Sequence, residues 1–317
     1  MDFRDRRSLR QCAQNALAGA NYDPKKLMLI YAGVSLAATL IFMCIHYLLD
    51  NMIANTGGLG GIGQRSLLST LQMCLQLALQ VVLPVWQFGL IAVTLRLVRG
   101  QNVTPPTLLV GFYNFWPVIR LVLLQGLLVF GIAMAASYLG TMVFLFTPWA
   151  SGIMEAMSSA QELTEELMTA VMMESMLPLS VCTLLAIVAL VVPYLYKLRL
   201  AFYLLLDSQE HRALQAIRIS RGLMRGKRMA LFKLDISFWW YYLLDGLALG
   251  VCFGDVVLTA VGVTLPIPFT VSAILFTVLG CALQLGLYYW KGMEVQTTYA
   301  AFYQAVIQPP LVPNHEA

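Results

Sequence analysis

Charged residues are scarce in this sequence: Lys, Arg, Asp and Glu together make up 11% of its 317 residues. Soluble domains carry about 25%, so this chain has too few charges to cover the surface of a soluble fold of its length. Hydrophobic residues reach 59%, and the mean hydropathy is +0.74. The composition therefore excludes a soluble domain, a disordered tail and a coiled coil, and it predicts an integral membrane protein.

Cysteine and histidine are also few, with six and three residues. The cysteines form no CxxC pair and five of them lie inside apolar runs, which excludes a secreted disulfide scaffold. Their spacing matches no metal site, HExxH and GxSxG are absent, and no GxGxxG follows a strand. The Gly-rich stretch Gly57–Gly63 lacks the Lys of a phosphate-binding loop and is expected to be a linker. We therefore expect no catalytic residues, no metal, no cofactor and no nucleic-acid partner.

Long apolar runs dominate the sequence. A hydrocarbon core about 30 Å thick needs about 20 apolar residues of helix, and six runs reach that length. None alternates in the period-two manner of a barrel strand. The sequence therefore predicts an all-α fold, a polytopic transmembrane helical bundle with six spans. The six runs are Leu27–Leu49, Leu67–Leu95, Val118–Phe146, Leu179–Leu206, Ile236–Val261 and Val271–Trp290.

Basic residues are distributed unevenly around these runs. Residues 1–26 carry six, Arg96 and Arg99 follow the second run, Arg120 lies at the start of the third, Lys197–Lys233 carries nine, and Lys291 follows the last run. Because basic loops are retained in the cytoplasm, these 19 of the 20 basic residues and both termini are predicted to be cytoplasmic. The opposite side then holds the acidic insertion 149–177, where Ser159-x-x-Glu162 predicts the start of a surface helix.

A Gly-centred passage precedes each odd-numbered run, and the three passages predict a repeated unit of one interfacial helix and one hairpin. They are Ala18–Tyr22, Val110–Asn114 and Arg225–Met229. The alternative is that any hairpin protein carries such glycines. The predicted organisation is one membrane domain, 1–317, made of the interfacial helix 1–26, the hairpin 27–98, an interfacial segment with a second hairpin 104–206, an interfacial helix with a third hairpin 207–291, and the cytoplasmic tail 292–317.

Two of the interfacial segments have the periodicity of amphipathic helices. The apolar face of the first contains Leu9, Cys12, Ala13, Ala16, Leu17 and Ala20. The weakly apolar face of the other contains Ala213, Ala216, Ile217, Ser220 and Met224. Basic residues beside the second helix serve either topological retention alone or the binding of anionic lipid headgroups or a membrane partner. These candidates are Arg218, Arg221, Arg225, Lys227 and Arg228.

Polar residues inside the apolar runs are costly to place in lipid. In the second run Ser69 and four glutamines, Gln72, Gln76, Gln80 and Gln87, lie within about 80° of one another on a helix. This stripe either bonds to another helix or lines a wet path.

Asp245, midway along the fifth run, is the acidic residue expected deepest in the membrane, with Gln284, Gln125 or the stripe as partners. At the outer end of the first run, His46 and Asp50 are one helical turn apart. They are expected to form a hydrogen bond or, with further ligands, a cation site.

Two passages resemble a known family. They are ALQAIRISRGLMRGKRMALFKLDISF at Ala213–Phe238 and TTYAAFYQ at Thr297–Gln304. Both are similar to the DUF975 family of bacterial integral membrane proteins, whose activity is unknown. The resemblance implies a protein of the bacterial cytoplasmic membrane. A more distant similarity extends to the membrane domains of glycerophosphodiester phosphodiesterases, but no phosphodiesterase domain is expected here, so that chemistry does not transfer.

The sequence leaves two functions open. The first is a non-enzymatic accessory or scaffold protein that binds lipid or a membrane partner through its cytoplasmic helices. The alternative is a small-molecule or proton-linked carrier, whose polar path contains Asp245, Gln284 and the glutamine stripe. A membrane enzyme ranks below both, because no pair of catalytic groups converges in the sequence.

Overall fold

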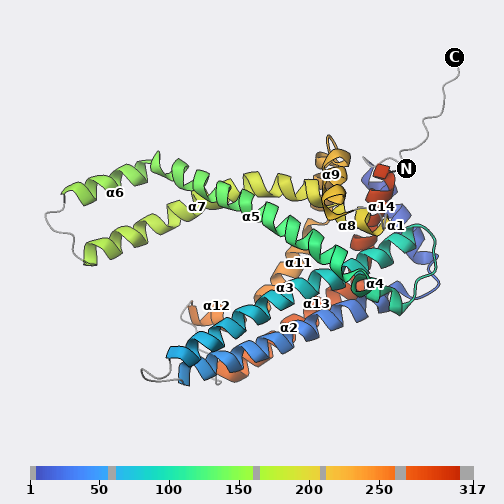
Figure 1. Cartoon of the computed structure of the whole chain (residues 1–317), viewed down its shortest axis with the longest axis horizontal. Coiled ribbons are helices and arrows are strands. Elements are labelled where there is room, and N and C mark those ends of the chain that lie inside the picture. Colours follow the sequence, from blue (N-terminus) through green and yellow to red (C-terminus); the bar gives the residue numbers. More distant parts are fainter. Residues whose placement is uncertain (1–4, 56–61, 160–164, 208–211, 261–268, 308–317) are drawn as a thin grey trace, which may run out of the picture. The chain divides into compact units, whose positions relative to one another are not determined.

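The computed structural model describes the chain except for residues 1–4, 56–61, 160–164, 208–211, 261–268 and 308–317. The described residues are mostly helical and contain no strand, which confirms the all-α prediction. Most of the expected linker Gly57–Gly63 lies outside the described residues. The helices of Figure 1, with two short turns of 3-10 (η2) and π (η3) type, are α1 Arg6–Ala18, α2 Pro24–Asn55, α3 Ile62–Val98, η2 Pro105–Leu109, α4 Val110–Tyr113, α5 Phe115–Leu145, α6 Pro148–Ser159, α7 Glu165–Leu198, α8 Ala201–Asp207, α9 Ala213–Leu223, α10 Arg228–Ser237, α11 Trp239–Cys252, α12 Gly254–Ala260, α13 Phe269–Leu287, η3 Tyr288–Gly292 and α14 Met293–Ile307.

Five helical segments in the described part of the chain are long and apolar enough to cross a membrane. They are Pro24–Ile53, Gly63–Val98, Phe115–Leu145, Met176–Asp207 and Val271–Ile307. The fifth apolar run is instead divided among α10, α11 and α12, with breaks at Phe238 and Phe253. α11 has 14 residues, about 21 Å at 1.5 Å per residue, so a sixth span stays a prediction.

The chain folds as two compact units. The first contains Met1–Ile119, Phe202–Arg212 and Met229–Ala317, and the second contains Arg120–Ala201 and Ala213–Arg228. Helix α5 begins in the first unit and continues in the second.

The core of the first unit is built around the C-terminal half of α3. In the apolar stretch of α3 that could cross a membrane, 56% of the residues are buried inside the protein. The corresponding share in α2, which runs beside α3, is 11%. Helices α1, α4 and α14 and the turn η2 pack on this half of α3. One buried cluster consists of Leu27, Met28, Trp86, Leu90, Val93, Leu97, Val103, Leu108 and Met293.

Helix ends follow from local capping. Asp5 caps α1 by accepting a hydrogen bond from the Arg7 backbone N–H at 3.0 Å. Gly100, with φ of 66°, follows α3, and the Gln101 N–H bonds back to the Arg96 carbonyl at 2.9 Å. A positive φ of this size suits glycine, which has no Cβ to clash, so the sequence itself fixes where α3 stops.

The predicted apolar face of α1 is covered by protein. Leu9 and Ala13 are fully buried, and α1 packs on α14 and α3. Whether α1 also lies in the membrane plane stays a prediction.

Residues 293–307, which the sequence analysis placed in the tail, form the most buried helix of the unit. Helix α14 continues α13 through the π turn η3, and Tyr303, Phe302 and Ala300 have no exposed surface. This part of the tail is therefore a core element.

The second unit contains α6, α7, α9 and most of α5. Helices α5 and α7 approach each other at Gly140, where a Cβ atom would stand 2.6 Å from Thr183 Cα. Helix α9 packs on α7 through Ala216, Ile217 and Ser220, part of its predicted apolar face. The helix start expected at Ser159 is wrong, because α6 ends at this residue. Glu162 of that motif lies outside the described residues.

Candidate functional site

A cavity of about 370 Å³ lies inside the first unit, between α2, α3, α11, η3 and the start of α14. Its volume falls in the range of small-molecule sites, about 300–1,000 Å³. Aliphatic residues such as Met28, Leu36 and Leu90 form part of its wall. The polar and aromatic part consists of Tyr31, Ser35, Thr39, Gln87, Tyr241, Tyr242, Asp245, Tyr288 and Gln296.

Helical spacing places these side chains on the cavity. Tyr241 and Tyr242 precede Asp245 by four and three residues, so all three share one face of α11. Tyr31, Ser35 and Thr39 recur at intervals of four residues along α2 in the same way. Asp245 and Gln87 were predicted from the sequence and the tyrosines were not, although the three- and four-residue spacing before Asp245 indicates that Tyr241 and Tyr242 share its face.

The carboxyl group of Asp245 is the central polar feature. Its Oδ1 atom is buried and has no hydrogen-bond partner within the protein. Tyr288 interacts with the carboxyl group through a side-chain hydrogen bond and electrostatically, and Tyr241 interacts with it electrostatically. An unsatisfied buried carboxyl oxygen is costly, so the position is set up to accept a bond from a molecule in the cavity.

The cavity walls are held by contacts outside it. The Trp86 Nε1–H donates to the Tyr31 carbonyl at 3.1 Å, and the two rings stack with centroids 5.9 Å apart. The Ser35 and Thr39 hydroxyls donate to carbonyls of α2 one turn earlier, at 2.8 and 2.9 Å. These bonds position the walls and occupy the two hydroxyl protons.

A chain of hydroxyl groups leads away from the cavity. The hydroxyl of Tyr242 hydrogen-bonds to that of Tyr299, which in turn donates to Asp235 Oδ1. Asp235 lies on α10, before α11 begins. The network connects the wall of the cavity with the helix that precedes α11.

The glutamine stripe is divided in the structure. Gln87 lines the cavity with Asp245, whereas Gln76 and Gln80 are exposed on α3 and are not part of its lining. Gln284 is 9% exposed on α13 and also lies outside the lining. Gln125, in the second unit, donates to the Leu198 carbonyl at 3.4 Å.

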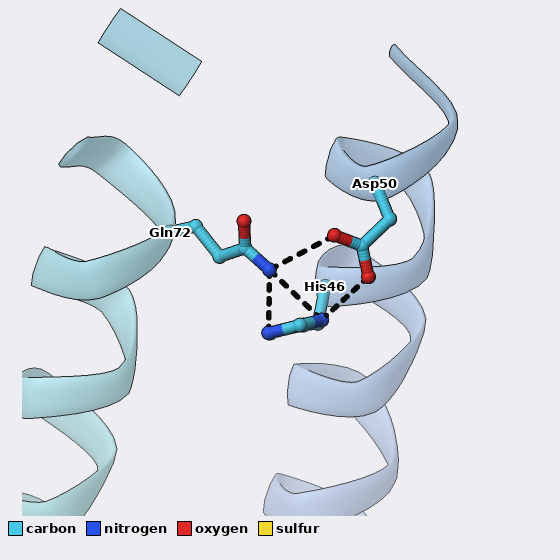
Figure 2. A network of polar contacts seen from close by, with 3 residues as sticks. All are labelled: His46, Asp50 and Gln72. Carbon is cyan, nitrogen blue, oxygen red and sulfur yellow. Dashed lines mark hydrogen bonds and ion pairs between the residues drawn. The ribbon is translucent and has the colours of Figure 1, made fainter. Parts of the chain in front are cut away.

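Gln72 belongs to a separate network with His46 and Asp50 (Figure 2). His46 Nδ1 lies 3.0 Å from Asp50 Oδ2, which confirms the predicted hydrogen bond. Gln72 Nε2 donates to Asp50 Oδ1 at 3.0 Å and lies 2.6 Å from His46 Nε2. With the His46 proton on Nδ1, the ring donates to Asp50 and its Nε2 accepts from Gln72, whereas the 3.1 Å contact between Gln72 Nε2 and His46 Nδ1 joins two donors. The network joins α2 to α3, and among the described residues no three His, Cys, Asp or Glu side chains are placed to hold a metal ion.

Sequence reasoning also missed an ion pair at the end of α3. Arg99 Nη1 lies 2.7 Å from Asp207 Oδ1, and the Tyr303 hydroxyl donates to Asp207 Oδ2 at 3.1 Å. The hydrogen bond to Asp207 raises the pKa of the Arg99 guanidinium above its ordinary value. Because Arg99 lies in the turn after α3, Asp207 on α8 and Tyr303 on α14, no local pattern connects them. From the sequence, Arg99 was counted only among the basic residues that predict the membrane topology.

The predicted basic surface lies at α9 and the turn that follows it. Arg218 and Arg225 are exposed, whereas Lys227 and Arg228 are half-buried. Arg221 instead packs on α7, where its guanidinium hydrogen-bonds to the Tyr194 hydroxyl and lies 5.1 Å from the centre of that ring. Two of the five candidates are therefore clearly available to a partner or a lipid.

A second and larger cavity, of about 520 Å³, lies between α1 and the turn after α3. Its polar lining consists of Ser8, Gln11, Asn15, Asn21, Gln101 and Asn102. Because none of its lining residues is charged, it offers less selective chemistry than the cavity at Asp245.

Comparison with known proteins gives one match. The family model described as "Protein of unknown function (DUF975)" matches residues 1–309. No curated protein and no solved structure matches the chain. The two passages that carry the resemblance meet in the fold, because Tyr299 of the second bonds to Asp235 of the first. Since the match covers nearly the whole sequence, the chain belongs to the DUF975 family of proteins of unknown function.

Proposed function

We propose that this protein is a non-enzymatic carrier of the bacterial cytoplasmic membrane, which binds a small polar solute in the cavity at Asp245. The observation that carries the proposal is Asp245, which lines a cavity of about 370 Å³ and whose buried Oδ1 atom has no hydrogen-bond partner within the protein. Gln87, from the predicted polar path, lines the same cavity. A site with one unsatisfied polar group and mostly apolar or aromatic walls is typical of small-molecule binding.

The position of the cavity along α2 supports carriage across a membrane. Tyr31 and Thr39 follow the first residue of α2, Pro24, by 7 and 15 residues, or about 10 and 22 Å of helix. A site at this depth is inside the span. Polar groups at such depth are typical of solute and ion pathways, and the hydroxyl chain from Tyr242 to Asp235 would serve proton coupling.

The residues of the cavity do not favour an enzyme. The described lining contains one carboxyl group and no His, Cys, Lys or Arg. Nucleophilic catalysis needs a base beside the nucleophile, and the described lining holds no histidine and no second carboxyl group to serve as one. Binding without chemical change fits this set of side chains better.

The test is equilibrium binding and proteoliposome uptake with labelled cationic, neutral, zwitterionic and anionic small solutes. We expect at least one class to be retained by the wild-type chain and lost in Ser35→Phe, because Ser35 lines the cavity and a phenyl ring would fill it. Ala37→Phe is the matched control, since Ala37 is exposed on the same helix and lies outside the lining. Retention of no solute class by the wild type, or equal retention by both variants, would contradict the proposal.

The second candidate function is the accessory or scaffold role. It is favoured by the exposed Arg218 and Arg225 of the second unit, beside a helix face that is buried on α7. In the predicted topology this surface faces the cytoplasmic leaflet, where basic residues attract anionic lipid. Both functions fit one chain, because the two surfaces use different residues.

A further inference from the structure

We propose that the solute bound at Asp245 is an organic ammonium ion, meaning a protonated amine or a quaternary ammonium group on a small carbon skeleton. The inference rests on the proposed function and adds the chemical class of the ligand. It follows from the charge of the cavity, the composition of its walls and its volume.

The charge of the cavity determines whether it favours a cation or an anion. Asp245 is the only charged side chain among the described residues that line it. An anion would bring a second negative charge beside this carboxyl group, whereas a cation pairs with it. In surroundings of low dielectric constant this difference is larger than in water, so the cavity favours a cation.

The walls favour an organic cation. Four tyrosines line the cavity, from α2, α11 and η3: Tyr31, Tyr241, Tyr242 and Tyr288. The rings of Tyr241 and Tyr242 are 5.6 Å apart, and those of Tyr241 and Tyr288 are 6.5 Å apart. Groups of aromatic rings beside an acid attract ammonium groups through the ring quadrupole. Aliphatic side chains such as Leu36 and Leu83 would contact the carbon skeleton.

The volume argues against a bare metal ion or a proton. Hard metal ions take six or more oxygen ligands at about 2.0–2.6 Å, and a cavity of about 370 Å³ is far larger than such a shell. A proton bound to Asp245 would occupy almost none of the cavity, whose volume suits a larger ligand. A molecule the size of choline fits these constraints.

The test compares choline with its neutral carbon isostere, 3,3-dimethyl-1-butanol, on the full chain in phosphatidylglycerol nanodiscs. Bound radiolabelled choline is measured in competition with unlabelled choline, with the isostere and with acetate. We expect unlabelled choline to displace the label and the other two to leave it in place. This competition experiment uses the wild-type chain alone, so it does not depend on the folding of a variant.

Variants then locate the site. Asp245→Asn should weaken choline binding by about 30-fold or more, the usual loss when one member of a buried charge pair is removed. Asp50→Asn, an acid of the same unit in the Figure 2 network and outside this cavity, should bind as the wild type does. Tyr242→Leu should bind about two- to fivefold more weakly and Tyr242→Phe nearly normally, because the ring and not the hydroxyl contacts the cation.

The source of the ammonium group is decided in the same assay. Adding phosphatidylethanolamine to the nanodiscs should reduce choline binding if lipid headgroups occupy the site, and should leave it unchanged if the ligand is a free solute. Displacement by the isostere, no choline binding at all, or equal binding by Asp245→Asn would overturn the ammonium assignment. If the wild-type chain still retains a neutral or anionic compound of the solute panel, and Ser35→Phe does not, the carrier proposal stands without the ammonium assignment. If the wild type retains no compound, both fail.

Discussion

At the residue scale, Gly89 and Gly111 of the first unit lie close to the backbone of a neighbouring element. A methyl group on Gly89 of α3 would collide with the Leu108 carbonyl, and one on Gly111 of α4 would collide with the Val85 carbonyl. Both obstacles are backbone atoms, which cannot rotate away as a side chain can. The contacts set the distance between α3 and the η2–α4 segment, and α3 also carries Gln87 to the cavity.

Replacing Gly89 by alanine should therefore lower the free energy of unfolding by about 1–3 kcal/mol, the usual cost of overpacking a filled core. The measurement is denaturant unfolding of the purified chain in detergent. Gly33→Ala is the matched control, because nothing lies within 4 Å of the Cβ position at Gly33 of α2. There the higher helix propensity of alanine should keep or raise stability, by up to about 1 kcal/mol. Equal effects of the two variants would show that the α3–η2 contact is looser than in this structure.

Single residues also show where sequence reasoning stops. Asp245 was predicted as a functional residue because an acid in an apolar run needs a partner, and the structure places it on a cavity. Gln72 and Gln87 looked equivalent on one helical stripe, yet they lie on different networks. Helical periodicity gives the face of one helix. It does not give the neighbour that covers each level of that face, which depends on contacts between distant segments.

At the scale of elements, the sequence predicted helices better than it predicted what covers them. The apolar face of α1 was predicted as that of an interfacial helix, and its residues Leu9 and Ala13 are buried where α1 packs on α14 and α3. An apolar helix face can pack on lipid or on protein, because both neighbours are apolar. The sequence pattern of α1 therefore does not distinguish between them. Helix α14 was assigned to a tail because it follows the last predicted run, Val271–Trp290, and it contains the polar residues Glu294, Gln296 and Gln304. These polar residues instead meet Lys291, the cavity and Arg99.

Helix α9 offers a test of the accessory role. The double variant Arg218→Gln and Arg225→Gln should co-purify with less phosphatidylglycerol and cardiolipin than the wild type, measured by mass spectrometry of bound lipid. At about 1 kcal/mol for each basic residue near an anionic leaflet, the expected loss of affinity is about 30-fold. Arg65→Gln, which removes the basic residue predicted on the opposite side, is the control and should retain the lipid. An unchanged lipid content in the double variant would exclude α9 as a lipid-binding surface.

At the scale of the whole molecule, the main question is the number of spans, and the packing of the first unit bears on it. Helix α1 precedes the first long apolar helix and α14 ends the last one, yet the two pack together. If this contact lies at one membrane surface, α1 and α14 are on the same side of the membrane, which requires an even number of crossings between them. Five helical segments are long enough to cross. An even number is reached if the α10–α12 segment, Arg228–Ala260, crosses as well.

Cysteine labelling on intact cells tests this topology, in a chain whose six native cysteines are replaced by alanine. A membrane-impermeant maleimide should label Ser151→Cys, which is exposed on α6 in the predicted outer insertion. It should not label Arg7→Cys, Arg225→Cys or a cysteine appended after Ala317 until the cells are permeabilised. Labelling of the appended cysteine but not of Arg7→Cys would mean an odd number of spans, with α10–α12 on one side of the membrane. In that case Asp245 would lie outside the hydrocarbon core, and the carrier would lose its buried acid.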